Sequence, residues 1–333
     1  MPLSRRTITL VAALGVIVVG GAAAIAAVAL SGQGAAPPGR DTTIVASDLS
    51  KATDAAARAS PGTPQHAAAA YLSAQPTAVW LTPEADPPGE VRQRIAHLAA
   101  EAREQDARVA VVVYGLPGRD CGGLSAGGLD EDAYLDWTRE IGDALRDAAD
   151  TSPIVVLEPD SLALAPECGN VDERVAQLSA AVEAIASDGT WIYVDGGHSD
   201  WLPPAQMAEL IERVDRASAV DPGRGIRGFA TNVSNYRSTA DEVAYAREVA
   251  GHLDGLHAII DTSRNGAGST GEWCNPPGRL VGEPGGTIGD DVVDTNLWIK
   301  PPGESDGACN GGPAAGAWWP EAAVELTRRV IGD

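Results

Sequence analysis

Short apolar runs alternate along this chain with longer segments of helical periodicity. The runs are rich in Val and Ile, which is typical of strands buried on both faces of a sheet. They predict strands at 77–81, 109–114, 154–157, 191–194, 225–231, 256–260 and 295–299. Helices are predicted between and after them, at 89–107, 131–149, 171–185, 204–214, 239–252 and 319–330. This alternation indicates an α/β fold with a parallel sheet, and seven strand–helix units favour a closed or nearly closed barrel.

The amino-terminal part has a different pattern. Arg5 and Arg6 precede an uncharged apolar run at 8–30, the order found in export signals. The run is also long enough to span a bilayer, so cleavage or retention as an anchor stays open. We expect residues 1–30 to be a signal peptide or membrane anchor, 31–65 a flexible linker, and 66–333 the catalytic domain. The protein is then secreted, with membrane contact only through the anchor if it is uncleaved.

Charge and cysteine content narrow the class of protein. The net charge is −22, from 46 acidic and 24 basic residues, which excludes nucleic acid as a partner because such a surface repels phosphate. The four cysteines contain no C-x-x-C pair, so zinc is a poor interpretation. In an exported protein they predict two disulfides, and three pairings are possible from the spacing alone.

Polar and aromatic side chains follow the predicted strands. The third strand ends at Glu158-Pro159-Asp160. One such aspartate could simply cap the next helix. All seven strand ends carry such groups, however: Trp80, Asp120, Asp160, Asp195 with His198, Asn232, Asp261, and Lys300 with Glu304 and Asp306. In a parallel barrel these ends meet at one mouth, so a lined cleft is the better explanation.

The chemistry of such a cleft is restricted by what the sequence lacks. It has no H-E-x-x-H, calcium loop, phosphate loop or dinucleotide fingerprint, so we expect no cofactor and no metal. The stretch Gly123–Gly127 matches the G-x-S-x-G elbow of serine hydrolases, with Ser125 as nucleophile. An esterase stays open as an alternative, although Ser125 follows its strand too distantly for that elbow.

Paired carboxylates beside tryptophans favour sugar chemistry. Cleaving a glycosidic bond needs a carboxylic acid of raised pKa and a second group that activates or supplies the nucleophile. Indole rings offer flat faces for pyranoses, and Trp80, Trp201, Trp273 and Trp298 all follow strands or lie in their loops. A sugar-binding protein without turnover is the non-enzymatic alternative.

At this point the chain resembles the inverting cellulases of glycoside hydrolase family 6. The matching stretches run in family order from about Trp80 to the carboxyl end: 114–121 (YGLPGRDC), 158–160 (EPD), 195–202 (DGGHSDWL), 228–236 (GFATNVSNY), 260–266 (IDTSRNG), 272–274 (EWC) and 298–307 (WIKPPGESDG). The resemblance implies a distorted barrel of about seven parallel strands.

The resemblance also implies roles for three aspartates. Asp160 matches the general acid, and Asp120 matches the residue that raises the pKa of the acid and helps to position the attacking water. Asp306 matches the candidate base. The cysteines match positions that the family joins as Cys121–Cys168 and Cys274–Cys309. Glu158 receives no role.

The remaining matches imply substrate contacts. The positions concerned are Tyr114, Trp80, Asp195, His198, Trp201, Asn232, Trp273, Lys300 and Glu304. Trp80 and Trp273 resemble platforms on one side of the cleaved bond, and Trp201 one on the leaving-group side. The implied ligand is a β-glucan or cello-oligosaccharide, bound by a monomer.

Departures from the family pattern affect the expected mode of action. Ala126 stands where members often have a water-binding serine, and Pro203-Pro204 replaces a second leaving-group tryptophan. The segments 121–134 and 274–309 are short for loops that roof a tunnel. We therefore expect an open cleft and internal cleavage, with an exo-acting cellobiohydrolase as the alternative. With no separate carbohydrate-binding module, crystalline cellulose should be a poor substrate.

Overall fold

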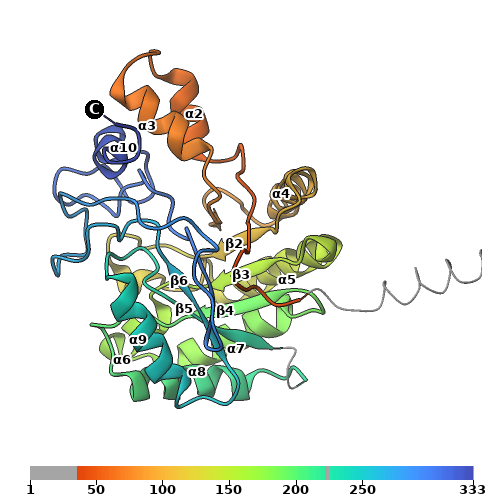
Figure 1. Ribbon diagram of the computed structural model, residues 1–333. Coiled ribbons are helices and arrows are strands. Elements are labelled where there is room, and N and C mark those ends of the chain that lie inside the picture. The colour runs from red at the N-terminus through yellow and green to blue at the C-terminus, as the bar shows by residue number, and fades with distance from the viewer. Residues whose placement is uncertain (1–35, 222–224, 333) are drawn as a thin grey trace, which may run out of the picture. The chain divides into compact units, whose positions relative to one another are not determined.

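The protein forms a seven-stranded parallel sheet in which the strands are neighbours in chain order. The computed structural model describes residues 36–221 and 225–332. The strands are β1 (Val79–Leu81), β2 (Ala110–Val113), β3 (Ile154–Leu157), β4 (Trp191–Asp195), β5 (Ile226–Thr231), β6 (His257–Asp261) and β7 (Val293–Leu297). All seven predicted strands are therefore confirmed. The sheet curls into the distorted barrel that the sequence predicted (Figure 1).

Helices follow most of the strands and cover the outside of the sheet (Figure 1). The predicted ones are α4 (Val91–Gln105), α5 (Glu131–Asp147), α7 (Val171–Ile185), α8 (Pro204–Ala217), α9 (Thr239–Ala250) and α10 (Pro320–Thr327). The sequence did not predict α6 (Ser161–Cys168), which begins directly after β3. Its eight residues include Pro166 and are apolar on most sides, so helical periodicity does not reveal it.

Residues 37–65, which we expected to belong to a flexible linker, are part of the barrel domain instead. Ile44 and Val45 are buried in its core, and Ile44 forms a parallel bridge with Arg108. Two further helices follow, α2 (Lys51–Arg58) and α3 (Pro64–Ser73), and α3 packs against α10 (Figure 1). The Ala, Ser, Thr and Pro content that indicated a linker also suits capped helices, because Ala favours helices and Ser and Thr cap them.

The predicted signal peptide or anchor at 1–30 lies outside the described residues. In the part of the chain that the structure covers, no helix is both long and apolar enough to cross a bilayer.

The strand residues divide between two apolar layers. Val111, Val155 and Val194 point outward and pack against the helices, whereas Val112 and Tyr193 belong to a smaller cluster on the other face of the strands. Side chains two residues apart on a strand point to the same face. Asp195 therefore lies on the same face as Tyr193, and Tyr114 lies on the same face as Val112. The apolar interior of the barrel thus gives way to polar groups at the carboxyl ends of the strands.

The two edge strands, β1 and β7, approach each other without forming a ladder. The backbone N–H of Ala78 donates to the Trp298 carbonyl (2.9 Å), and the indole N–H of Trp80 donates to the Ile299 carbonyl (2.9 Å). These bonds join β1 and the residue before it to the segment that follows β7. Trp80 and Lys300 are therefore held on the same wall of the site.

Candidate active site

A cleft of about 850 Å³ opens at the carboxyl ends of the strands. Its volume lies in the range of ligand pockets, roughly 300–1,000 Å³. Ten of the predicted catalytic and substrate-binding residues line it: Trp80, Tyr114, Asp120, Asp160, His198, Trp201, Trp273, Lys300, Glu304 and Asp306. The fold therefore brings together residues separated by more than two hundred positions in the chain.

Asp160 stands at the N-cap of α6 but does not act as a cap. Its side chain makes no capping hydrogen bond, and its backbone has a φ of +69°, in the left-handed region that is uncommon for residues other than glycine. The conformation is held from outside: the backbone N–H of Asp160 donates to Oδ2 of Asp195 (2.9 Å). The carboxyl group of Asp160 is thereby left to line the cleft, so the alternative of a simple helix cap is wrong.

The electrostatic surroundings of Asp160 favour its protonated form. Burial and the negative charges of Asp120 and Asp306 raise the pKa of Asp160 to about 7, although the ammonium of Lys300 acts in the opposite direction. These are the two causes, desolvation and like charge, by which proteins make a carboxyl group a general acid near neutral pH.

Asp120 lies in a tightly turned loop after β2. Its backbone has a φ of +56°, and its Oδ2 accepts a short hydrogen bond from the backbone N–H of Ser125 (2.6 Å). The next residue, Cys121, forms a disulfide with Cys168 at the end of α6. The disulfide thus joins the loop that carries Asp120 to α6, the helix that begins directly after Asp160. The second predicted disulfide, Cys274–Cys309, is also present.

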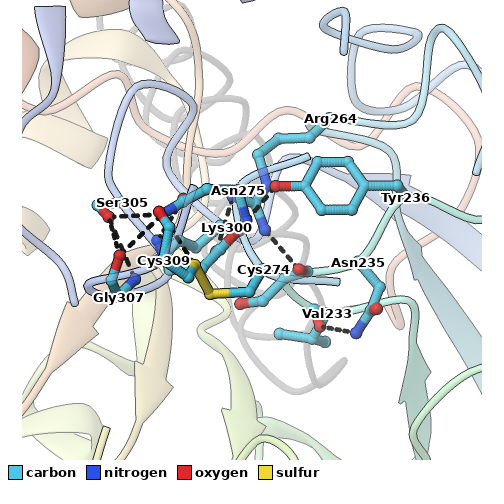
Figure 2. Close-up of polar contacts among 12 residues, drawn as sticks. Val233, Asn235, Tyr236, Arg264, Cys274, Asn275, Lys300, Ser305, Gly307 and Cys309 are labelled. Carbon is cyan, nitrogen blue, oxygen red and sulfur yellow. Dashed lines mark hydrogen bonds and ion pairs between the residues drawn. A yellow bond between two sulfur atoms is a disulfide. The ribbon is translucent and has the colours of Figure 1, made fainter. Parts of the chain in front are cut away.

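Asp306 is a buried carboxylate surrounded by donors, among them Tyr236, Arg264 and Asn275, which are drawn in Figure 2. Arg264 donates to its Oδ1 (2.8 Å), and the Tyr236 hydroxyl (2.8 Å) and the Asn275 backbone N–H (3.0 Å) donate to its Oδ2. Burial alone would raise the pKa of Asp306, but the charges of Arg264 and Lys300 and these hydrogen bonds outweigh it and lower the pKa. Asp306 is therefore ionised at the pH at which Asp160 is protonated.

Aromatic rings and a lysine form one wall of the cleft. Trp80 meets Tyr114 edge to face with centroids 5.2 Å apart, and Nζ of Lys300 lies 5.3 Å from the centre of the Trp80 ring. Trp273 is 56% exposed, so most of its ring is free to contact a ligand. An open ring of this kind suits the apolar face of a sugar.

His198 and Trp201 lie together on another part of the wall, with ring centroids 5.3 Å apart. The backbone N–H of Asp200 donates to Nδ1 of His198 (3.2 Å). Burial and the nearby charge of Arg237 lower the pKa of His198 to about 4, so the ring is neutral near pH 7. Since Nδ1 accepts a bond, the neutral ring carries its proton on Nε2, where it serves as a hydrogen-bond donor.

Two predicted substrate-binding residues lie behind the wall. Asp195 is 1% exposed and accepts from the backbone N–H groups of Asp160 and Gly197, the latter at 3.1 Å. Asn232 is 0% exposed and bonds to the Asp261 carbonyl (2.8 Å) and the Arg237 backbone N–H (3.0 Å). Both side chains support the backbone of the site from below.

Two other residues that we had placed at the mouth are also structural. Asp261 is buried, and its carboxylate accepts backbone N–H bonds from Ser234, Ser263, Ile299 and Lys300. It thus joins the ends of β5, β6 and β7. Trp298 is buried in the cluster beneath α3 and α10, where it cannot reach a ligand.

The structure does not form the serine-hydrolase elbow. Ser125 comes twelve positions after the end of β2, beyond a short 3₁₀ turn, and its backbone is held by Asp120 and Arg119. The elbow requires a serine directly between strand and helix. The one histidine that lines the cleft, His198, has its Nδ1 occupied by Asp200, so the parts of a triad are not assembled.

Sequence reasoning missed several residues that build the site. Arg264, Tyr236 and Asn275 hold Asp306. Only their place could have drawn attention to them, since Arg264 and Tyr236 lie in matching stretches and Asn275 directly follows one. Glu158 is 0% exposed, and its carboxylate oxygens accept from the backbone N–H of Gly115 (3.0 and 3.1 Å). It ties the end of β3 to the loop after β2. No local sequence signal distinguishes such a tether from a catalytic carboxylate.

One group of side chains in the described residues could hold a cation. Ligand atoms of Asp48, His97 and Glu101 lie within 4.8 Å of one another, outside the cleft and near the surface. Nε2 of His97 is 2.8 Å from Asp48, and Glu101 accepts from the Asp48 backbone N–H (2.9 Å). These bonds tie α4 to the segment before α2, and this structural role explains why the three side chains lie together.

The fold and site together define a barrel protein with a carboxylate-rich, aromatic-lined cleft of the kind used on carbohydrates. A sequence comparison extends this: residues 39–330 match the profile of "Glycosyl hydrolases family 6". The chain belongs to this family.

Individual relatives agree with the family assignment. Endoglucanase A of Cellulomonas fimi is 40% identical over 260 residues, which are 78% of this chain and 55% of that protein. The chain thus spans about half the length of that relative. Endoglucanase 1 of Streptomyces halstedii is 36% identical over 339 residues, covering 97% of this chain and 99% of that protein.

Among solved structures, the endoglucanase Cel6 from Mycobacterium tuberculosis is similar, in a complex with a methyl cellobiosyl thio-cellobioside. It is 34% identical, with a TM-score of 0.77 over 86% of this chain and 96% of that chain.

Proposed function

We propose that this protein is an inverting endo-β-1,4-glucanase with Asp160 as its general acid. The observation that carries the proposal is the position of Asp160, which lines the cleft together with two further aspartates, Asp120 and Asp306. Burial and the charges of these two aspartates raise its pKa to about 7. A carboxyl group that is still protonated near neutral pH can donate to a glycosidic oxygen.

The mechanism follows from the different states of the carboxyl groups. Asp160 donates its proton to the glycosidic oxygen as the bond from that oxygen to the anomeric carbon breaks. A water molecule attacks the anomeric carbon from the opposite face, so the configuration at that carbon is inverted, and the water gives up a proton. Asp120 helps to place this water and, through its charge, keeps the proton on Asp160 beforehand.

Asp306 is the candidate base, acting through the attacking water or a second water. Three of the roughly four acceptor positions of a carboxylate are occupied by Arg264, Tyr236 and Asn275. One position therefore remains for water. Since the pKa of Asp306 is lowered, it is a weak base whose orientation matters more than its strength.

The substrate is a β-1,4-glucan chain, such as cellulose or a related β-glucan. Trp80, Trp273 and Trp201 supply faces for sugar rings, and His198, Lys300 and Glu304 supply hydrogen bonds. Internal cleavage is supported by the rim of the cleft, where Trp273 is 56% and Leu124 46% exposed, because a roofed tunnel would cover such side chains. The relatives compared above are endoglucanases, which supports the same mode of action. The two disulfides are consistent with work outside the cytoplasm.

The test is Asp160→Asn assayed on a soluble β-glucan. General acid catalysis typically contributes about 10²–10⁴-fold, so we expect a loss of that order. Asp132→Asn, an exposed aspartate on α5, is the matched control and should keep wild-type activity. A fall in viscosity that precedes the release of reducing ends would support internal cleavage. Near-normal activity of Asp160→Asn would contradict the assignment.

A further inference from the structure

A second groove lies beside the proposed catalytic cleft, on the helix α2. It has a volume of about 600 Å³ and is lined by Ala55, Arg58, Ala59, Gln65 and the indole of Trp318, among others. We call it the α2 groove. Much of it comes from the amino-terminal segment that the sequence indicated as a linker, so sequence reasoning gave no sign of it.

The α2 groove continues the cleft at its Glu304 end. Lys51, the first residue of α2, lines both hollows. Its Nζ lies 3.3 Å from Oε1 of Glu304 and donates to the Gly316 carbonyl (2.6 Å). Glu304 and Gly316 line the cleft, so the two hollows meet at this ion pair.

The aromatic wall of the α2 groove is fixed relative to the cleft. Trp318 pairs with Glu304 in an antiparallel bridge, and the Trp319 backbone N–H donates to the Gly303 carbonyl (2.8 Å). A Cβ on Gly303, which has a φ of +91°, would lie 2.7 Å from the Trp318 ring, so the indole packs on bare backbone there. Side chains of paired residues lie side by side, so Trp318 is placed next to Glu304.

The lining of the α2 groove suits a sugar chain. An indole supplies an apolar face, and Gln65, Arg58 and Lys51 supply groups that bond to hydroxyls. Exposed long side chains such as these can adapt to a polar ligand at little cost. The volume is also within the range of ligand sites.

We propose that a β-1,4-glucan chain bound in the cleft extends past Glu304 into the α2 groove, where Trp318 stacks on an additional sugar unit. This inference rests on the proposed function, since it assigns more of the same substrate to a second surface. Its consequence is a preference for longer chains, because only they reach the α2 groove.

The test compares two substitutions on different faces of the helix α2. Ala55→Arg places a long, helix-compatible side chain in the α2 groove, whereas Ala57→Arg places the same side chain on an exposed position of α2 outside both hollows. For each variant, kcat/KM is measured on cellotriose, cellotetraose, cellopentaose and cellohexaose. We expect Ala55→Arg to lower the ratio of the cellohexaose to the cellotriose value about fivefold or more, and Ala57→Arg to leave it unchanged.

Trp318→Ala gives an independent measurement and should lower the same ratio. If Trp318→Ala fails to fold, the comparison of Ala55→Arg with Ala57→Arg still tests the inference. An unchanged ratio in Ala55→Arg would overturn the inference while leaving the proposed function intact. Wild-type protein that hydrolyses none of the four substrates would instead overturn the proposed function, and the inference with it.

Discussion

The backbone N–H of Asp160 donates to Oδ2 of Asp195, 2.9 Å away, and this bond holds Asp160 in a left-handed conformation. Asp195 lies on β4 and Asp160 follows β3, so the bond also fixes Asp160 relative to the neighbouring strand. Burial and the charge of Asp160 raise the pKa of Asp195 well above its ordinary value.

This relationship predicts different outcomes for two substitutions at one position. Asp195→Asn keeps an acceptor oxygen and should retain much of the wild-type activity near pH 5. Asp195→Ala leaves the backbone N–H groups of Asp160 and Gly197 without their acceptor, which costs about 1–3 kcal/mol of stability for each. Urea unfolding and kcat at pH 5 measure the two effects. Equal stability and equal kcat in the two variants would show that the acceptor oxygen at position 195 is unimportant.

The pH profile of kcat/KM should be bell-shaped and displaced to the acidic side. Its alkaline limb reports loss of the proton from Asp160, whose pKa is raised to about 7. Its acidic limb should lie below the ordinary Asp range, because the pKa of Asp306 is lowered. An Asp120→Asn variant removes one of the negative charges that raise the pKa, so its alkaline limb should move to lower pH. An alkaline limb that does not move would exclude this coupling.

Glu158 predicts a pH dependence of stability. Burial raises its pKa from 4.5 to about 7, despite backbone hydrogen bonds from Gly115 and Leu116. Because the folded protein holds this proton more tightly than the unfolded chain, the stability from Glu158 is complete below about pH 4.5 and is lost as the pH rises through 7. The difference is about 3 kcal/mol.

The matched measurement is urea unfolding of wild type and Glu158→Gln between pH 4 and 8. Gln cannot titrate, so the variant should lose less stability over this interval than the wild type. Parallel curves for the two proteins would contradict the role of Glu158 as the titrating group.

The Cys274–Cys309 disulfide should support both stability and catalysis. It closes a loop of 35 residues, for which the expected stabilisation is about 2–4 kcal/mol. Asn275 lies next to the bridge (Figure 2). It donates to Asp306 and accepts from the Asp306 backbone N–H (2.8 Å), so the bridge also restrains the candidate base. The double variant Cys274→Ser, Cys309→Ser should unfold at lower urea concentration and have lower kcat. Unchanged kcat would mean that the hydrogen bonds of Asp306 suffice without the bridge.

The strands and most helices of the barrel could be predicted because buried parallel strands are continuous apolar runs. The amino-terminal helices could not, since α2 and α3 share their composition with linkers. They are stabilised by the packing of α2 on α3 and of α3 on α10, which no local pattern encodes. Within the site, Asp120, Asp160 and Asp306 were predicted from their place after strands. Their supports were not: Glu158, Asp195 and Arg264 act through long-range contacts that depend on the folded chain.

The most direct test of the central claim compares two leaving groups in the Asp160→Asn variant. A dinitrophenolate leaves without a proton, whereas a sugar hydroxyl needs one, so only the second reaction depends on the acid. We expect kcat/KM of Asp160→Asn to fall about 10²–10⁴-fold on cellohexaose. On dinitrophenyl β-cellobioside the same variant should stay close to the wild type. Equal losses on both substrates would contradict the assignment of Asp160 as the proton donor.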